Sequence, residues 1–326
     1  MDCLPRRRPE RPPPPAVDGG EPASAHVRPE RADGEHYRTY ADALAALDPP
    51  ALFENRPSYR LLAAHLTGGK GRLDLTRGRY FDGVNIGEAL SHELAARDSD
   101  PQPAGAPGLP LRDLIGDPCD LFRRSAMPAI TTLTLRRATP GDASFLLHRR
   151  DPAKVTHAGG LYQVIPVGIF QPADGNPASE QNDLSLWRSM AREFSEELLA
   201  TSEDYQHLGS PLDYGRWPFY RQLSTARKTG RLRVSCLGLG VDPLTLAVDI
   251  LTTAVFDSDL FDTTFDGLVA ANAEGRVIAS QGASCAPGVP FTSEAVDRFA
   301  GGAEPMQAAG AATLQLAWRH RNSLLS

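Results

Sequence analysis

The chain has 326 residues and a formal net charge of −6, and hydrophobic residues make up 41% of it. This composition is typical of a globular protein, and the acidic balance argues against a basic nucleic-acid-binding surface over the whole chain. Long apolar runs are interrupted by charge, as Asp249 interrupts 244–256, so we expect no membrane span. The N-terminus lacks the apolar core of a secretory signal, and the four cysteines show no metal or disulfide spacing. We therefore predict a reduced, cytoplasmic protein.

The first third of the chain predicts three successive regions. Residues 1–35 are rich in proline and arginine, with acidic residues interspersed, and we predict a disordered, extended tail. Residues 36–98 predict a small α+β region, and a loop rich in proline and glycine then leads into a linker over 99–127. Within the α+β region we expect helices over 40–47 and 86–96 and strands over 59–66 and 72–75.

Residues 128–326 show clearer periodicity and predict one larger domain. Strands over 130–136 and 144–149 flank a hairpin signal at 139–142. A helix is predicted over 184–200 and another over 305–325. Further apolar runs that suit strands lie at 161–170, 232–239, 244–256 and 276–279. Strands on both sides of a central helix, with a closing helix, predict an α/β fold with a mixed sheet.

The helix predicted over 184–200 carries the strongest candidate site. Apolar residues follow each other at intervals of three and four and should form a buried stripe: Leu184, Trp187, Ala191, Phe194 and Leu198. Glu193, Glu196 and Glu197 share the opposite face, where like charges repel unless a cation lies among them. Clustered carboxylates suit Mg²⁺ or Mn²⁺. The alternative interpretation is a solvated helix face without a ligand.

The segment Arg192-Glu193-Phe194-Ser195-Glu196-Glu197 resembles the centre of the Nudix box, whose pattern there is Arg-Glu-hydrophobic-any-Glu-Glu. A strand at 145–150 and a glycine-containing segment at 159–168 precede it, as in that family. The resemblance covers about residues 128–326 and implies an α/β/α sandwich. It also implies that Glu193, Glu196 and Glu197 hold Mg²⁺ or Mn²⁺ against a substrate diphosphate, with Arg192 orienting them. Glu196, Glu197 and Arg192 are then the expected catalytic residues.

The sequence departs from the rest of the box. The opening glycine, the first glutamate and the closing glycine of the pattern fall at Ala178, Leu184 and Leu199. Gly175, Glu180 and Asp183 lie nearby and would need a shifted loop to substitute. These departures favour a second hypothesis, a non-catalytic Nudix-like sensor of a nucleotide metabolite that acts in regulation.

Two functional hypotheses therefore stand side by side. The first is a Mg²⁺-dependent hydrolase of a nucleoside-diphosphate derivative, in which an activated water attacks phosphorus. It needs a general base, for which Glu274 and Glu294 are candidates, and phosphate contacts, for which the candidates are Arg149, Arg150 and Lys154. The second is the sensor. A third, weaker interpretation is a scaffold on which the glutamates only add charge.

The expected partners follow from the same resemblance. The segment from 165 through the box also resembles a module of bacterial transcriptional regulators, which carry a DNA-binding helix-turn-helix. The helix predicted over 86–96 has no close partner helix, so we do not expect this chain to bind DNA without a partner protein. A nucleotide-like small molecule is the expected ligand.

Overall fold

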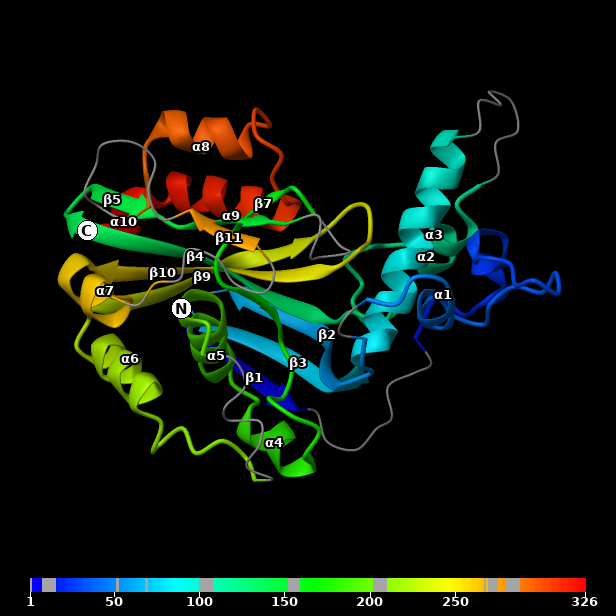
Figure 1. The fold of residues 1–326 in the computed structure, drawn as a ribbon, viewed down its shortest axis with the longest axis horizontal. Helices are drawn as coiled ribbons and strands as arrows, with labels where there is room; N and C mark the ends of the chain where they lie inside the picture. Colours follow the sequence, from blue (N-terminus) through cyan, green and yellow to red (C-terminus); the bar gives the residue numbers. More distant parts are fainter. Residues whose placement is uncertain are drawn as a thin grey trace.

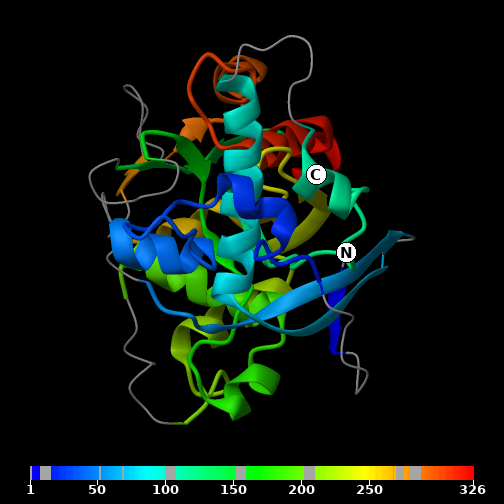
Figure 2. The same cartoon turned by 90° about the vertical axis from the view of Figure 1, so that its right-hand side faces the viewer.

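The computed structural model describes residues 2–7, 16–50, 53–67, 70–99, 108–151, 159–201, 210–266, 268, 275–278 and 288–326. A central sheet lies between two groups of helices, and a second sheet and a long helix, formed by the N-terminal part of the chain, adjoin it (Figures 1 and 2).

The central sheet has the strand order β12-β5-β4-β10-β9, with β8 also paired to β4. Its strands are β4 (Pro128–Thr139), β5 (Asp142–Phe145), β8 (Val167–Ile169), β9 (Leu232–Val241), β10 (Val248–Asp257) and β12 (Val289–Pro290). β4 runs parallel to β10 and antiparallel to β5 and β8, so the sheet is mixed. β4 and β10 are buried over most of their length, which explains their nearly continuous runs of apolar residues and threonine.

Two predicted strands are interrupted in the structure. The hairpin at 139–142 joins β4 to β5 as expected, with Gly141 at a φ of +84° that favours glycine. The strand predicted over 144–149 continues as β6 (Leu147–Arg150), which belongs to a separate three-stranded sheet with β7 (Tyr162–Val164) and β11 (Gly275–Ile278). The apolar run 161–170 divides into β7 and β8 on either side of Pro166, which has no amide hydrogen for a strand ladder.

Helices cover both faces of the central sheet. On one face lie α5 (Leu186–Leu199), α6 (Pro218–Lys228) and α7 (Ser258–Thr264), with α4 (Pro177–Asn182) beyond them. On the other lie α8 (Ser293–Ala300), α9 (Ala308–Arg319) and α10 (Arg321–Leu324). Each group has its own hydrophobic core: Phe194 of α5 packs with Ile250 and Phe256 of β10, whereas Phe299 of α8 packs with Leu133 and Val255. The predicted α/β fold with a mixed sheet between helices is confirmed.

The N-terminal region adds a three-stranded sheet in the order β1-β3-β2, formed by β1 (Asp2–Arg7), β3 (Lys70–Arg79) and β2 (Pro57–Thr67). Around it lie η1 (Pro22–Val27), α1 (Tyr40–Leu47), α2 (Tyr80–Ser99) and α3 (Pro110–Ile115). The helices and strands predicted for residues 36–98 are all present, and α1 has the predicted bounds. Leu61, Leu73 and Leu75 belong to the same hydrophobic core as Phe194 of α5, so this region packs directly onto the α5 face.

The tail predicted for residues 1–35 differs from the described structure. β1 pairs in parallel with β3, and η1 follows at residues 22–27. Ser24 is fully buried, and its hydroxyl donates to the carbonyls of Gly19 at 2.7 Å and Glu21 at 2.8 Å. Residues 2–7 and 16–35 are thus paired or packed in the structure, because contacts with distant parts of the chain, such as that of the Val17 amide with the Arg123 carbonyl at 2.9 Å, order a segment that has no core of its own.

The linker predicted over 99–127 also contains packed structure. The buried Glu93 carboxylate of α2 accepts hydrogen bonds from the amides of Leu111, at 2.6 Å, and Arg112, at 3.1 Å, and so caps α3. Arg124 is buried and donates to the Leu246 carbonyl at 2.7 Å. Residues 100–107 lie outside the described residues. The domain boundaries at 35, 98 and 127 stay predictions.

No helix within the described ranges combines the length and the apolar character needed to cross a bilayer.

Candidate functional site

Helix α5 forms because a capping residue, a buried apolar stripe and a left-handed terminal residue all favour a helix over this range. Ser185 caps its N-terminus, with its side chain accepting from the Arg188 amide at 3.3 Å. Met190, Phe194 and Leu198 are almost completely buried along one side. The helix ends where Ala200 adopts a left-handed conformation with a φ of 50°. The predicted helix is confirmed, and its first turn begins two residues later than expected.

Arg192 makes its ion pair with Asp183 and not with the glutamates. A guanidinium nitrogen of Arg192 lies 3.0 Å from a carboxylate oxygen of Asp183, and the side chains are 3% and 0% exposed. Arg192 also donates to the Gln171 carbonyl at 2.6 Å. The Asp183 carboxylate accepts further hydrogen bonds from the Ala173 amide, at 2.7 Å, and the Tyr214 hydroxyl, at 2.9 Å. This network ties α5 to the end of α4 and to two loops.

The electrostatics of this network favour a charged Arg192. Burial on its own would lower the pKa of Arg192, but Tyr214, Asp183 and the nearby Glu193 and Glu196 raise it above its usual value. Burial likewise raises the pKa of the Tyr214 hydroxyl, which stays protonated and donates to Asp183. A cation surrounded by hydrogen-bond acceptors in this way holds structure in place rather than reacting.

Glu193 and Glu197 meet the backbone of β8. A carboxylate oxygen of Glu197 accepts from the Val167 amide at 2.6 Å. The Glu193 carboxylate occupies the space beside Gly168, where an added Cβ would stand 2.0 Å from its Cδ. Both glutamates are half-buried. The interpretation as a solvated helix face therefore does not describe these two side chains, since each is packed against a strand.

Glu196 lies on the same helix and is also half-buried. Within the described ranges, no three histidine, cysteine, aspartate or glutamate side chains are gathered closely enough to form a metal centre. By donor type the three glutamates suit Mg²⁺ or Mn²⁺, and the absent side chain of Gly168 provides the room that the Glu193 carboxylate uses. Their assignment as metal ligands, and that of Glu196, Glu197 and Arg192 as catalytic residues, stay predictions.

Among the other candidate residues, Glu294 is not brought to α5. Glu294 lies in the first turn of α8, on the opposite face of the sheet, and is exposed. Arg149 of β6 lies over the Tyr162 ring, 5.8 Å from its centroid, and Arg150 follows it on the same strand. Glu274 and Lys154 lie outside the described residues. Their roles as general base or phosphate contacts stay predictions.

Sequence reasoning noted Asp183 only as a nearby acid and missed its role. The signal was available, since Asp183 precedes Ser185, the cap of α5, and is the only acidic residue between Glu180 and Arg192. Glu180 itself pairs with Arg77 at 2.6 Å and lines a pocket of about 430 Å³ beside β3. Gly168 ends the glycine-containing segment 159–168, but its contact with Glu193 depends on how β8 packs on α5.

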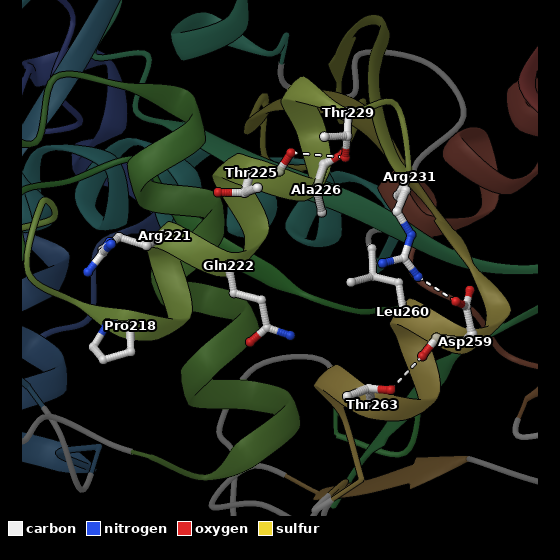
Figure 3. Close-up of a pocket in the computed structure, with 10 residues that line it drawn as sticks. All are labelled: Pro218, Arg221, Gln222, Thr225, Ala226, Thr229, Arg231, Asp259, Leu260 and Thr263. Atoms are coloured by element: carbon white, nitrogen blue, oxygen red, sulfur yellow. Dashed lines mark hydrogen bonds and ion pairs between the residues drawn. The ribbon is translucent and has the colours of Figure 1, made fainter.

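A larger groove of about 760 Å³ lies between α6 and α7 (Figure 3). Neither this groove nor the pocket beside Glu180 has Glu193, Glu196 or Glu197 in its lining. The three glutamates and the groove are therefore separate features of the same helical face.

The comparisons with known proteins give matches among solved structures. No protein-family model matches the chain, and no curated protein matches it. Among solved structures, a Nudix hydrolase from Alicyclobacillus acidocaldarius aligns with 58% of this chain and 90% of its own at 16% sequence identity, with a TM-score of 0.30. A TM-score this low establishes no common fold, so the functional argument rests on the residues of α5.

Proposed function

We propose that the chain is a divalent-metal-dependent hydrolase of a nucleoside-diphosphate derivative, with its site on α5. The observation that carries the proposal is the placement of two carboxylates of the Nudix-like motif, Glu193 and Glu197, against the backbone of β8. Arg192, the cationic residue of the motif, forms its ion pair with Asp183. By donor type, three carboxylates on one side of a helix suit a divalent cation.

The residues have distinct roles in this proposal. Glu193, Glu196 and Glu197 would hold Mg²⁺ or Mn²⁺, since carboxylate oxygens are the ligands that these ions prefer. Such an ion supplies positive charge against a diphosphate and activates the attacking water. Arg192 is a positioning residue: its bonds to Asp183 and Gln171 fix the rotation of α5.

The test is product release from a panel of nucleoside-diphosphate compounds with Mg²⁺ or Mn²⁺. We expect metal-dependent turnover by the wild type and a loss of at least about a hundredfold in Glu197→Gln, the range seen when a positioned catalytic group is removed. Glutamine keeps an oxygen that can accept from the Val167 amide, so the fold is preserved. Glu88→Gln on α2 is the matched control. Equal turnover by wild type and Glu197→Gln would overturn the proposal.

The sensor remains a second candidate, and a specific observation favours it. Ala178, Leu184 and Leu199 stand where the box has a glycine, a glutamate and a glycine. Saturable binding of a nucleoside diphosphate by folded protein, with no product released under any metal condition, would select the sensor over the hydrolase.

A further inference from the structure

The groove between α6 and α7 is open and has the volume of a small-molecule site. Its volume of about 760 Å³ falls within the range of roughly 300–1,000 Å³ found for ligand pockets. Figure 3 shows Pro218 and Arg221 at one end, Gln222 in the middle, and Arg231 with Asp259 at the other end. The remaining lining residues are Thr225, Ala226, Thr229, Leu260 and Thr263.

The lining presents hydrogen-bonding groups in a regular order. Arg221 and Thr225 of α6 and its C-cap residue Thr229 follow each other at intervals of four, so they share one side of the helix. The Thr229 hydroxyl donates to the carbonyls of Thr225 and Ala226, both at 3.1 Å, and its oxygen can still accept from a ligand. Gln222 donates from its amide to the Thr264 hydroxyl at 3.0 Å, which fixes the orientation of that amide. Hydroxyls, an amide and two guanidiniums suit a ligand that is both polar and anionic.

The local charge supports an anionic ligand. From Tyr214 to Val241 the chain contains six arginine or lysine residues and no aspartate or glutamate, although the whole chain has a net charge of −6. Arg221 and Arg231 from this segment line the groove. With Asp259 as the one acidic residue in the described lining, the two arginines leave the groove with a positive balance, which favours ligands of negative charge.

The Arg231–Asp259 pair shows how an anion would be accommodated. Its nitrogen and oxygen are 2.5 Å apart, but the two side chains are 46% and 76% exposed. A pair this exposed contributes little stability, so an anion of higher charge can take the place of the Asp259 carboxylate. At the other end of the groove, Arg221 makes no ion pair with any residue that the structure describes.

We propose that the groove between α6 and α7 binds a small phosphate-bearing metabolite, such as a nucleotide or a sugar phosphate, without a metal ion. The guanidinium of Arg231 accepts the phosphate, since its planar set of donors matches phosphate oxygens. Arg221 contacts a second charged or polar end. Thr225, Thr229 and Gln222 bond the hydroxyls or ring nitrogens of the ligand body.

The experiment is isothermal titration of the full chain with adenosine monophosphate, glucose 6-phosphate and inorganic phosphate, in EDTA so that no metal site contributes. We expect saturable binding of at least one probe and a loss of about tenfold in affinity in Arg231→Gln and in Arg221→Gln. Asp259→Asn should bind about threefold more tightly, because the competing carboxylate is gone. Arg216→Gln, in the same basic segment but outside the groove, is the matched control.

The variants and probes of this experiment distinguish the groove from the proposed hydrolase site on α5. Glu197→Gln should bind the probes as the wild type does, so a failure of the hydrolase leaves this result standing. Preference for one organic phosphate over the other assigns the ligand body to a nucleotide or to a sugar. The proposal is overturned if folded wild type binds none of the three probes, or if Arg216→Gln loses as much affinity as Arg231→Gln.

Discussion

Two arginine–aspartate pairs on the same face of the molecule behave differently because of where they lie. Arg192 and Asp183 are 3.0 Å apart and almost completely buried, with hydrogen bonds to Tyr214 and two backbone groups. Arg231 and Asp259 are closer, at 2.5 Å, but exposed. Distance alone would rank the second pair as the stronger. Burial reverses that order, so the first pair holds the glutamate helix in place and the second can be replaced by a ligand.

The largest expected effect comes from breaking the buried pair. Asp183→Ala leaves the Arg192 guanidinium buried without its carboxylate, and we expect a loss of about 3–5 kcal/mol in the free energy of unfolding. Urea denaturation measures it. A loss below about 1 kcal/mol would show that the network does not fix α5.

Asp249 extends the comparison to a half-buried carboxylate whose partner is a hydroxyl. Thr131 donates to it at 2.7 Å, and burial raises the pKa of Asp249 to about 6. Asp249 therefore binds its proton more tightly in the folded state than in the unfolded state. The stability that this protonation contributes is complete below about pH 4. It is lost as the pH rises through about 6.

Asp249→Asn should therefore stabilise the protein at pH 7 by about 1–3 kcal/mol and remove this part of the pH dependence between pH 4 and 6. Urea denaturation of the variant and the wild type at several pH values checks it. Identical pH profiles for the two proteins would contradict the raised pKa.

Gly168→Ala tests whether the contact of Glu193 with β8 matters for metal binding. The new Cβ would stand 2.0 Å from the Glu193 Cδ, so the carboxylate must move. Because that carboxylate is the end of a flexible side chain, we expect little change in stability but about a tenfold loss in Mn²⁺ affinity, measured by electron paramagnetic resonance. Gly175→Ala, where an added Cβ meets nothing within 4 Å, is the control. Equal Mn²⁺ affinity in the two variants would remove Glu193 from the site.

The smallest effect is expected for the exposed pair. Asp259→Ala should change the free energy of unfolding by no more than about 1 kcal/mol. Measured beside Asp183→Ala in the same urea series, a comparable loss would show that burial does not separate the two pairs.

The elements that the sequence predicts well are those with local signals. Helix α1 ends before Pro49 and α5 follows the capping residue Ser185, and both lie where periodicity predicts them. The sequence did not predict α6, although Pro218 at its first position was a usable signal. Nor did it predict that β1 pairs with β3, because strand pairing across more than sixty residues leaves no local pattern.

The candidate site likewise combines features that the sequence predicts with features that it does not. The helical spacing of Glu193, Glu196 and Glu197 is visible in the sequence, and so is their resemblance to a known motif. The partner of Arg192 is not, because Asp183 reaches it only through the turn between α4 and α5. The approach of Glu193 and Glu197 to β8 depends on how a strand and a helix pack, which sequence spacing does not record.

The most direct test of the proposed site is the Mn²⁺ affinity of the wild type, Glu197→Gln and Glu88→Gln, measured by electron paramagnetic resonance without substrate. The account predicts saturable Mn²⁺ binding by the wild type and by Glu88→Gln, and a loss of at least about tenfold in Glu197→Gln. The same affinity in all three proteins, or no Mn²⁺ binding by the folded wild type, would contradict a metal site on α5.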